Sequence, residues 1–597
     1  MSLLQLSAVG LLAAHIGVSA YSLESIDHVV LFMQENRAFD HYYGTMAGVR
    51  GFADPNAQVN PNGNTVFYQE VPSSLSNVTD ELLPWYLNWK GGNWTEATQC
   101  IVAGDNGWVA NHGALNFGLN NQWPRNNTPY SWGYFKREDI PVQFGIADAY
   151  TVADMYQESV IGATMPNRAV WASGNNHLDG NLFIDNMWSP GCDATGFNCF
   201  PLTWKTIADY YQESNVTWQV WQNVDNWEDN PFSWFEQFID AANGSAYQIR
   251  GNSNTGLDKF FEAAAEGTLP QVSFIISDQE LTEHPPYMPK DGGWIQQQIF
   301  NAVVKSPKYN STVLMLSYDE SGGWGDHVVP YTSPEGTEGE WILDPYDTGF
   351  GPYTRGGHVF TENADHNSQI LFVEKWLAAK GHNVTTEQMP EWRRNHMSDL
   401  TKAFDFMNPD FSIPELEQAT YPLADANALW SGSAYCEAKY GDALPPVPYG
   451  LQNATEALAT EQGYKKVRGQ LTEGRWLTFE LNGYALSNPG NTSSIVAGPS
   501  TPEHEEKSQR WVLQQLSPGG NVFHMYSALD GKYISAGMQL ATNGTAAQNI
   551  TLTDMGNGQG YTFIQENGLY ASVAANGTVG STDVVSGFQV FSVTYAS

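Results

Sequence analysis

Residues 26–46 read IDHVVLFMQENRAFDHYYGTM, an apolar run that leads directly into polar and charged residues. Five apolar residues, 29–33, run directly into Gln34, Glu35, Asn36 and Arg37. A continuous apolar run of this length is typical of a buried strand in a parallel sheet. Ligands of parallel sheets bind beyond the carboxyl ends of the strands, so Glu35 and Asn36 lie where a functional site is expected.

The same pattern recurs between about residues 25 and 402, where apolar runs alternate with helical patterns. The other candidate strands are WQVW (218–221), VSFII (272–276) and TVLMLSYDE (312–320). Two stretches, 292–306 and 368–381, carry apolar residues at helical spacing. This alternation predicts an α/β fold with a mostly parallel sheet that is covered by helices on both faces.

Asp319 and Glu320 follow a candidate strand, as Glu35 and Asn36 do. Taken singly, each pair is more typical of a helix cap or a solvent-facing position. Taken together, they offer three carboxylates and one amide, and packed carboxylates repel one another unless a cation is present. We therefore expect one divalent metal ion, with Ca, Mg or Mn suiting all-oxygen ligands and Zn preferring some nitrogen or sulfur.

The stretch GATMPNRAVWASG (162–174) places Thr164 shortly before Pro166, and proline favours the first turn of a helix. A hydroxyl there lies where backbone amides can hold a phosphate, and a metal could make it a nucleophile. Arg168 could clamp phosphate oxygens. Read alone, the motif is more typical of an ordinary helix cap.

Histidine and tryptophan gather near these motifs. Histidines in such loops could bind phosphate or protonate a leaving alcohol, although a lone histidine is usually structural. The tryptophans could cradle a choline group or insert at a lipid interface, although core packing is more common. The residues concerned are His112, His284, His327, His366, Trp108, Trp123, Trp132 and Trp324.

Composition restricts the partners and the compartment. The net charge of -37 argues against nucleic-acid binding and against electrostatic docking on anionic membranes. Residues 1–20 are predicted to be a signal peptide, and twelve N-x-S/T sequons also indicate export, to the extracellular space or the cell wall.

The four cysteines of an exported chain suggest two disulfides. Cys192 and Cys199 would close a short loop, which leaves Cys100 to pair with Cys436. A zinc site is the rival interpretation, but the cysteine spacings fit no zinc ribbon.

The character of the sequence changes after the catalytic region, which we place at 21–440. Residues 441–473 are expected to be a linker, with 454–471 as one helix. Beyond Gly474, the turn dipeptides at 482, 530 and 567 each precede alternating apolar residues, a hairpin signal. Residues 474–597 are thus predicted to form a small all-β domain, a β-trefoil or else a jelly roll or sandwich, which either supports the catalytic domain or binds sugars.

Four stretches resemble the phosphoesterase family of phospholipases C and acid phosphatases, which belongs with the alkaline-phosphatase-like fold. They are HVVLFMQENRAFDHYYGTMAGVRGF, IADAYTVADMYQESVIGATMPNRAVWASG, GTLPQVSFIISDQELTEHPPYMPKDGG and TVLMLSYDESGGWGDHVVP. The resemblance implies an α/β/α sandwich in which Glu35, Asn36, Asp319 and Glu320 hold one metal. It also implies that Thr164 is transiently phosphorylated. The resemblance further implies that three histidines surround the phosphate: His112, His284 and His327. Asp365 and His366 match an Asp-His pair of the family.

Several residues depart from the family pattern. Ser321 replaces the usual Asn after Asp-Glu, Met165 stands where His is frequent, and Ala38 stands where Ser is common. The tail is also unlike the paired C-terminal modules of bacterial members. The expected function is a secreted, fungal-type phospholipase C with transient membrane contact. The alternatives are an acid phosphatase of small phosphate esters or an inactive carbohydrate-binding protein.

Overall fold

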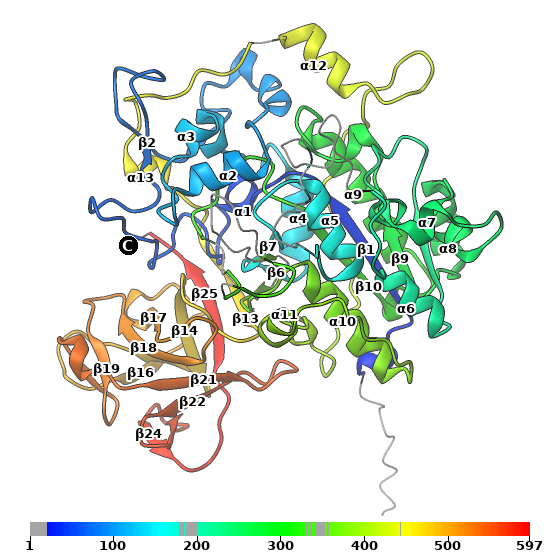
Figure 1. The fold of residues 1–597 in the computed structure, drawn as a ribbon. Helices are drawn as coiled ribbons and strands as arrows, with labels where there is room; N and C mark the ends of the chain where they lie inside the picture. Colours follow the sequence, from blue (N-terminus) through cyan, green and yellow to red (C-terminus); the bar gives the residue numbers. More distant parts are fainter. Residues whose placement is uncertain are drawn as a thin grey trace, which may run out of the picture.

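The computed structural model describes residues 21–596 except 178–183, 185, 187–199, 330–331, 335, 341–352, 355–357 and 442. The predicted signal peptide and the pair Cys192 and Cys199 lie outside the described residues. Figure 1 shows an α/β part formed by the first two thirds of the chain and a β unit formed by its end.

Four parallel strands form the sheet that positions the candidate site. They are β1 (His28–Gln34), β8 (Trp218–Trp221), β9 (Val272–Ile275) and β10 (Thr312–Tyr318), in the order β10-β1-β9-β8. In the register of β1 and β10, Gln34 is opposite Tyr318, so both strands end at the same edge. The predicted mixed α/β fold with a parallel sheet is confirmed.

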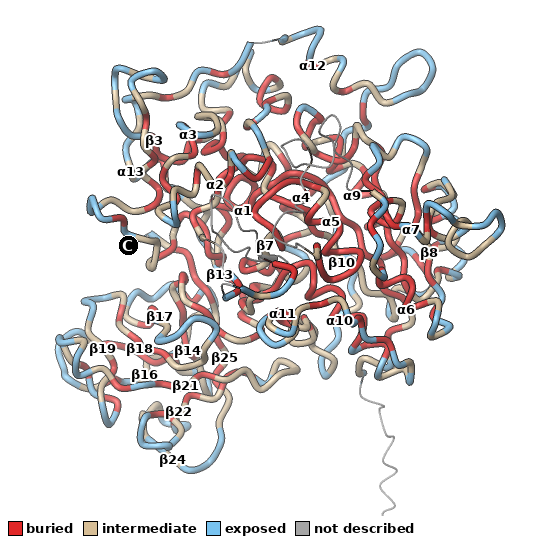
Figure 2. The backbone as a smooth tube through the Cα atoms, viewed as in Figure 1, coloured by how far each residue is buried: buried red, intermediate tan, exposed pale blue. Residues whose placement is uncertain are grey.

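The two faces of this sheet pack into different hydrophobic clusters. Val29 and Leu31 of β1 point into a cluster with α5 (Thr164–Ser173), α6 (Ile207–Glu213) and α10 (His366–Ala379). Val30 and Phe32 point into one with α8 (Leu257–Glu266) and α9 (Pro289–Val304). This alternation is the period of two expected of a strand buried on both faces. Figure 2 shows the sheet and α5 as largely buried.

The helices of the α/β part vary from one turn to more than four turns. Their bounds are α1 (Phe39–Tyr43), α2 (Trp108–Leu115), α3 (Trp123–Asn126), α4 (Pro141–Ala149), α5 (Thr164–Ser173), α6 (Ile207–Glu213), α7 (Glu236–Ile239), α8 (Leu257–Glu266), α9 (Pro289–Val304), α10 (His366–Ala379), α11 (Glu391–His396) and α12 (Gly432–Tyr440).

The chain ends in a large, mostly antiparallel sheet. Its three predicted hairpins are present as β14–β15, β18–β19 and β22–β23. Asn482 and Gly483 connect the first hairpin, both with positive φ, as a tight two-residue turn requires. The strands are β14 (Trp476–Leu481), β15 (Tyr484–Ser487), β16 (Val496–Pro499), β17 (Trp511–Gln515), β18 (Val522–Ser527), β19 (Tyr533–Ser535), β20 (Gln539–Ala541), β21 (Ile550–Asp554), β22 (Tyr561–Gln565), β23 (Tyr570–Val573), β24 (Val579–Thr582) and β25 (Gln589–Thr594).

The single helix predicted over 454–471 is wrong. A one-turn helix, α13 (Ala454–Ala457), is followed by β13 (Gly463–Arg468), which pairs with β25. Lys465 and Val467 point inward while their neighbours are more exposed, which is a strand pattern despite the helix-favouring composition. β13 also pairs with β12 (Val359–Phe360), and β12 with β6 (Val152–Ala153), so this segment joins the C-terminal sheet to the α/β part.

Cys100 and Cys436 form a disulfide, as the sequence analysis paired them, with their Cα atoms 5.7 Å apart. The bond links α12 to a 3-10 helix (Ala97–Cys100) across 336 residues of sequence. Within the described ranges, none of the helices combines the length and the apolar character needed to cross a bilayer.

Candidate active site

The carboxyl ends of β1 and β10 bring four predicted site residues together. Asn36 has a left-handed backbone (φ 59°), and its N–H donates to Asp319 Oδ1 at 3.1 Å. Glu35, Asn36, Asp319 and Glu320 are all buried. Residues 283 positions apart in the sequence therefore share one site because their strands are adjacent and parallel.

Thr164 is the first residue of α5 and faces the same carboxylates. Its Oγ1 donates to Glu35 Oε2 at 3.4 Å, and its side chain is buried. The threonine hydroxyl thus lies at a helix N-terminus next to the acidic cluster, where the backbone amides and the helix dipole favour negative charge.

Arg168 lies one helical turn after Thr164. It was predicted to clamp phosphate oxygens, but its guanidinium is directed at the carboxylates instead. Its Nε donates to Asp319 Oδ2 at 3.1 Å, and its Nη2 donates to Glu35 Oε1 at 2.8 Å. The remaining Nη1 donates to the backbone oxygen of Asp229 at 3.3 Å. The guanidinium is almost fully buried, so its position is that of a counter-charge for the carboxylates.

Asp229 is a site residue that the sequence analysis missed. It lies in the loop after β8, a strand that was predicted, and its buried carboxylate is 3.8 Å from Arg168 Nη2. Because β8 is parallel to β1, its carboxyl end lies at the same edge of the sheet. The rule that led to Glu35 and Asp319 would have found Asp229 had it been applied to this strand.

The charges of this cluster do not balance. Burial, followed by repulsion from Asp229, raises the pKa of Glu35 to about 8, and burial raises that of Asp229 to about 6. Burial and neighbouring carboxylates also raise the pKa values of Asp319 and Glu320. One arginine is too little positive charge for this many buried carboxylates.

A divalent cation fits these residues. The side-chain oxygen of Asn36, Oδ1, is buried without a hydrogen-bond partner. Asn36 directly follows Glu35 at the end of β1. The Asn36 amide oxygen and the neighbouring carboxylates together form an all-oxygen donor set. The raised pKa values of these carboxylates indicate that the set has too little positive charge around it. The chemistry of this set suits Ca, Mg or Mn better than a metal that prefers nitrogen or sulfur.

Two of the predicted histidines flank the cluster as neutral rings. His366 shares a hydrogen bond between its Nε2 and the Asp319 backbone oxygen at 2.8 Å, and burial lowers its pKa to about 4. His284 shares one between its Nδ1 and the Pro285 oxygen at 2.7 Å, and burial likewise lowers its pKa to about 4. A carbonyl only accepts, so the Nδ1 of His284 carries the proton and its Nε2 carries a lone pair.

The other predicted residues have contacts outside the cluster. His112 stacks on Trp108 and shares a hydrogen bond with the Trp108 oxygen at 2.9 Å. Asp365 forms the capping box of α10 and accepts a hydrogen bond from Arg393 at 2.7 Å. These contacts give Asp365 a clear structural role at the start of α10.

His327 occupies a different position from the predicted phosphate contact. Its Nδ1 lies 2.7 Å from Asp40 Oδ2 and its Nε2 lies 3.2 Å from Asp54 Oδ2. Burial disfavours the charged ring, but the two carboxylates outweigh this effect and raise the pKa of His327 to about 10. With both nitrogens directed at carboxylates, His327 is a buried imidazolium and has no nitrogen left for phosphate.

Asp40, Asp326 and His327 also have ligand atoms within 4.8 Å of one another, a spacing that a metal ion can use. Here, however, the imidazolium already supplies the positive charge that the carboxylates require. Among the described residues, the carboxylates at the strand ends do not form a group with this spacing, so the cluster around His327 is a second candidate metal position beside the one at the strand ends.

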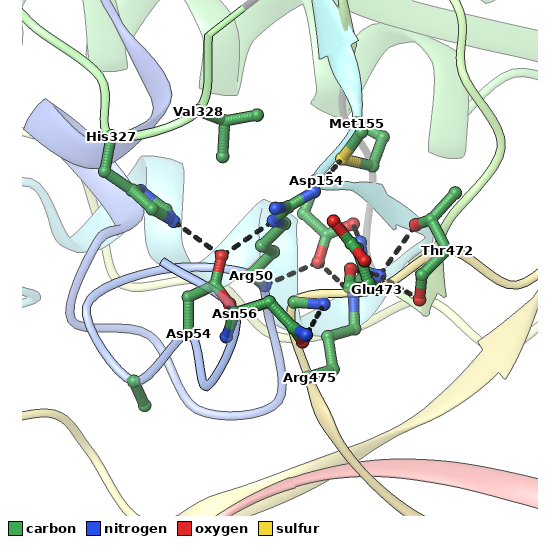
Figure 3. A network of polar contacts seen from close by, with 12 residues as sticks. Arg50, Asp54, Asn56, Asp154, Met155, His327, Val328, Thr472, Glu473 and Arg475 are labelled. Carbon is green, nitrogen blue, oxygen red and sulfur yellow. Dashed lines mark hydrogen bonds and ion pairs between the residues drawn. The ribbon is translucent and has the colours of Figure 1, made fainter. Parts of the chain in front are cut away.

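A buried network connects His327 to the C-terminal sheet (Figure 3). Asp54 accepts from Arg50 Nε at 2.8 Å, and the Arg50 backbone N–H donates to Asp154 Oδ2 at 2.6 Å. Arg475, which directly precedes β14, donates to the same Asp154 oxygen from its Nε at 2.7 Å. The C-terminal sheet is thus connected to the network beside the candidate active site by the buried ion pair of Arg475 and Asp154.

The space next to the site is small. A cavity of about 100 Å³ is lined by Arg37, Tyr156, Glu158, Glu320 and Trp324, among others. A larger cavity of about 510 Å³ runs along β10 and α9, but neither strand end lines it. The four tryptophans singled out from the sequence are all buried and pack in the interior: Trp108, Trp123, Trp132 and Trp324.

Comparison with known protein families identifies the family of this chain. The profile of the Phosphoesterase family matches residues 26–378, more than half of the chain. This chain belongs to the Phosphoesterase family. The match spans both strand ends, Thr164 and the three predicted phosphate-binding histidines.

Named relatives in this family are phospholipases C. A non-hemolytic phospholipase C of Burkholderia pseudomallei is 30% identical over 68% of this chain and 63% of its own length. A non-hemolytic phospholipase C of Pseudomonas aeruginosa is 33% identical over 66% and 59%, and the hemolytic phospholipase C of that organism is 30% identical over 80% and 70%. The chain thus spans about three fifths of the length of the two non-hemolytic relatives.

The solved structures that match include a GlcNAcα1-4Gal releasing endo-β-galactosidase from Clostridium perfringens. It is 15% identical over 20% of this chain and 32% of its own, with a TM-score of 0.16, and we draw no conclusion from it.

The raised pKa of His327 predicts a pH dependence of stability for this Phosphoesterase. A folded-state pKa of about 10 exceeds the ordinary 6.5, so the stabilisation is complete below pH 6.5 and is lost as the pH rises toward 10. The His327→Gln variant lacks this contribution, so its melting temperature should fall furthest below that of the wild type near about pH 6 and converge with it near about pH 10. Thermal unfolding followed by circular dichroism across this range measures the difference. A constant gap would contradict the assignment of His327 as an imidazolium.

Proposed function

We propose that this chain is a secreted, metal-dependent hydrolase of phosphate esters that acts as a phospholipase C, releasing diacylglycerol and a phosphorylated head group. The observation that carries the proposal is the Thr164 hydroxyl at the N-terminus of α5, 3.4 Å from a carboxylate of an undercharged oxygen cluster. Family membership and the phospholipase C relatives support the same reaction class. An alkaline-phosphatase-like sandwich with a trefoil-like tail is the architecture we propose for it.

Glu35, Asn36, Asp319 and Glu320 would hold the divalent ion. When bound, the ion would lower the pKa of the Thr164 hydroxyl and offset phosphate charge. Arg168 holds Glu35 and Asp319 in place from the side of α5. His366 does the same for the Asp319 backbone, since its ring bonds the Asp319 oxygen.

Thr164 would attack phosphorus in line with the leaving alcohol, forming a phosphothreonine while the ester bond breaks. The proton of the Thr164 hydroxyl would pass to the lone pair on Nε2 of the neutral His284, and His284 would then give it to the departing alkoxide. Water then attacks the phosphothreonine with the proton transfers reversed, which releases the phosphorylated head group and restores the hydroxyl.

The C-terminal sheet is proposed to support the active site. Arg475 and Asp154 form a buried ion pair between the two parts, and Gly48 of the α/β part donates to Thr594 Oγ1 at 2.9 Å. A Cβ at Gly48 would lie 2.6 Å from the Lys465 nitrogen, so the two backbones are in close contact. These contacts favour structural support over a separate glycan-binding module.

A comparison of two products tests the substrate class. The purified chain, supplied with each divalent metal in turn, is expected to release phosphocholine from phosphatidylcholine faster than it releases phosphate from p-nitrophenyl phosphate. The opposite ranking would favour the acid phosphatase. Absence of both activities with every metal would contradict the hydrolase itself.

A further inference from the structure

The loop 222–230, between β8 and a 3-10 helix (Pro231–Trp234), has an inner and an outer side. On the inner side, Asp229 is buried against Arg168 in the candidate active site. On the outer side, Val224 is 82% exposed and Trp227 is 40% exposed. A single short loop therefore carries a site carboxylate and two apolar side chains in contact with solvent.

Trp227 is held in this position by its neighbours. It has φ 51° and Glu228 has φ 61°, two consecutive left-handed residues that are not glycine, which is uncommon and must be fixed by packing. The Trp227 ring meets His284 edge-on with centroids 4.4 Å apart, and it meets Tyr287 at 5.6 Å. The half-exposed indole thus lies beside a histidine that we propose as catalytic.

A second exposed loop joins the first. Asn223 Nδ2 and Trp430 Nε1 donate to the same oxygen, Asp278 Oδ2, at 3.1 and 3.0 Å. The loop that leads to Trp430 and α12 is exposed (Figure 2) and carries three more apolar side chains, those of Tyr421, Leu423 and Leu429. We call the five residues Val224, Trp227, Tyr421, Leu423 and Leu429 the apolar rim.

The charges around the apolar rim identify the kind of surface it fits. Asp225, Glu228 and Asp425 are exposed in the same loops, and neither 222–230 nor 415–431 contains a lysine or arginine. Acidic loops on a chain of net charge -37 repel an anionic surface. Exposed apolar groups, with a tryptophan among them, suit the interface of an uncharged lipid layer.

We propose that the apolar rim docks this chain on a zwitterionic phospholipid surface, so that lipid head groups are presented to the site behind Asp229. The inference rests on the proposed phospholipase C function. The four tryptophans near the family motifs are buried and cannot contact lipid, whereas the side chains of the apolar rim are exposed.

Vesicle binding by the full chain tests this proposal. Phosphatidylcholine vesicles are sedimented with the wild type, Val224→Asp, Leu429→Asp and the matched control Val584→Asp. Val584 is 67% exposed and belongs to the segment between β24 and β25, and Figure 1 shows β24 at the opposite end of the molecule from α12. We expect the two rim variants to lower the bound fraction at least about tenfold, since each loses apolar burial and gains a charge to desolvate. The control should bind like the wild type.

Two further measurements separate this inference from the proposed function. Hydrolysis of the soluble ester p-nitrophenyl phosphorylcholine should be unchanged in the rim variants while hydrolysis of vesicle lipid falls. Replacing part of the phosphatidylcholine with anionic phosphatidylglycerol should weaken binding. Equal binding by the rim variants and the wild type, or stronger binding to anionic vesicles, would overturn the docking surface. A wild-type protein that binds vesicles but does not hydrolyse the soluble ester would overturn the proposed function and leave the docking surface in place, because vesicle binding needs no catalysis.

Discussion

The Thr164→Ala variant is expected to lose hydrolysis of phosphate esters by more than about a thousandfold, because it removes the proposed covalent nucleophile. Thr164 Oγ1 faces Glu35 at the start of α5, and the alanine variant keeps the helix and the carboxylates in place. Turnover of p-nitrophenyl phosphorylcholine at saturating metal measures the effect.

The conservative variant Thr164→Ser provides the control. It keeps a hydroxyl at the same helix position and should retain a measurable part of the activity, while both variants should melt close to the wild type because only a 3.4 Å hydrogen bond is changed. Trapping of radioactive phosphate on the serine variant but not on the alanine variant would support the covalent step. Near-normal turnover by Thr164→Ala would reject Thr164 as the nucleophile.

The strand ends could be predicted from the sequence because one physical rule covers them. An apolar run such as 29–33 is typical of a strand buried on both faces, and parallel strands place their carboxyl ends at one edge. The rule needs no knowledge of the loops, which is why Glu35 and Asp319 were found although 283 residues separate Asn36 from Asp319.

Side-chain partners across the fold could not be predicted in this way. His327 follows Asp319 closely in sequence, which suggested a phosphate contact, but its partner Asp40 lies in α1 and its partner Asp54 in the loop that follows α1. Arg168 was placed on the correct helix, but its three carboxylate neighbours come from three different strand ends. Such pairings depend on tertiary packing, and local spacing does not encode them.

The Asp319→Asn variant is expected to lose its bound metal and, with it, nearly all activity. Asp319 joins both strand ends, since it accepts from the Asn36 N–H and from Arg168. Its raised pKa means that the charged form is unfavourable in the metal-free protein. Removing that charge should therefore leave the metal-free protein at least as stable as the wild type.

The stabilisation that metal brings should separate the two candidate metal positions. A ligand at about a hundredfold excess over its Kd stabilises the native state by about 2.7 kcal/mol, so the wild type should melt higher with metal than with chelator. That rise should vanish in Asp319→Asn and persist in Asp326→Asn, which removes one partly exposed carboxylate from the cluster around His327. Elemental analysis after dialysis gives the metal content of each variant directly. Loss of metal from Asp326→Asn alone would place the ion beside His327. That result would also explain why Asp40 Oδ1 is buried without a hydrogen-bond partner, and it would leave the strand ends as a carboxylate cluster neutralised by Arg168 and by bound protons.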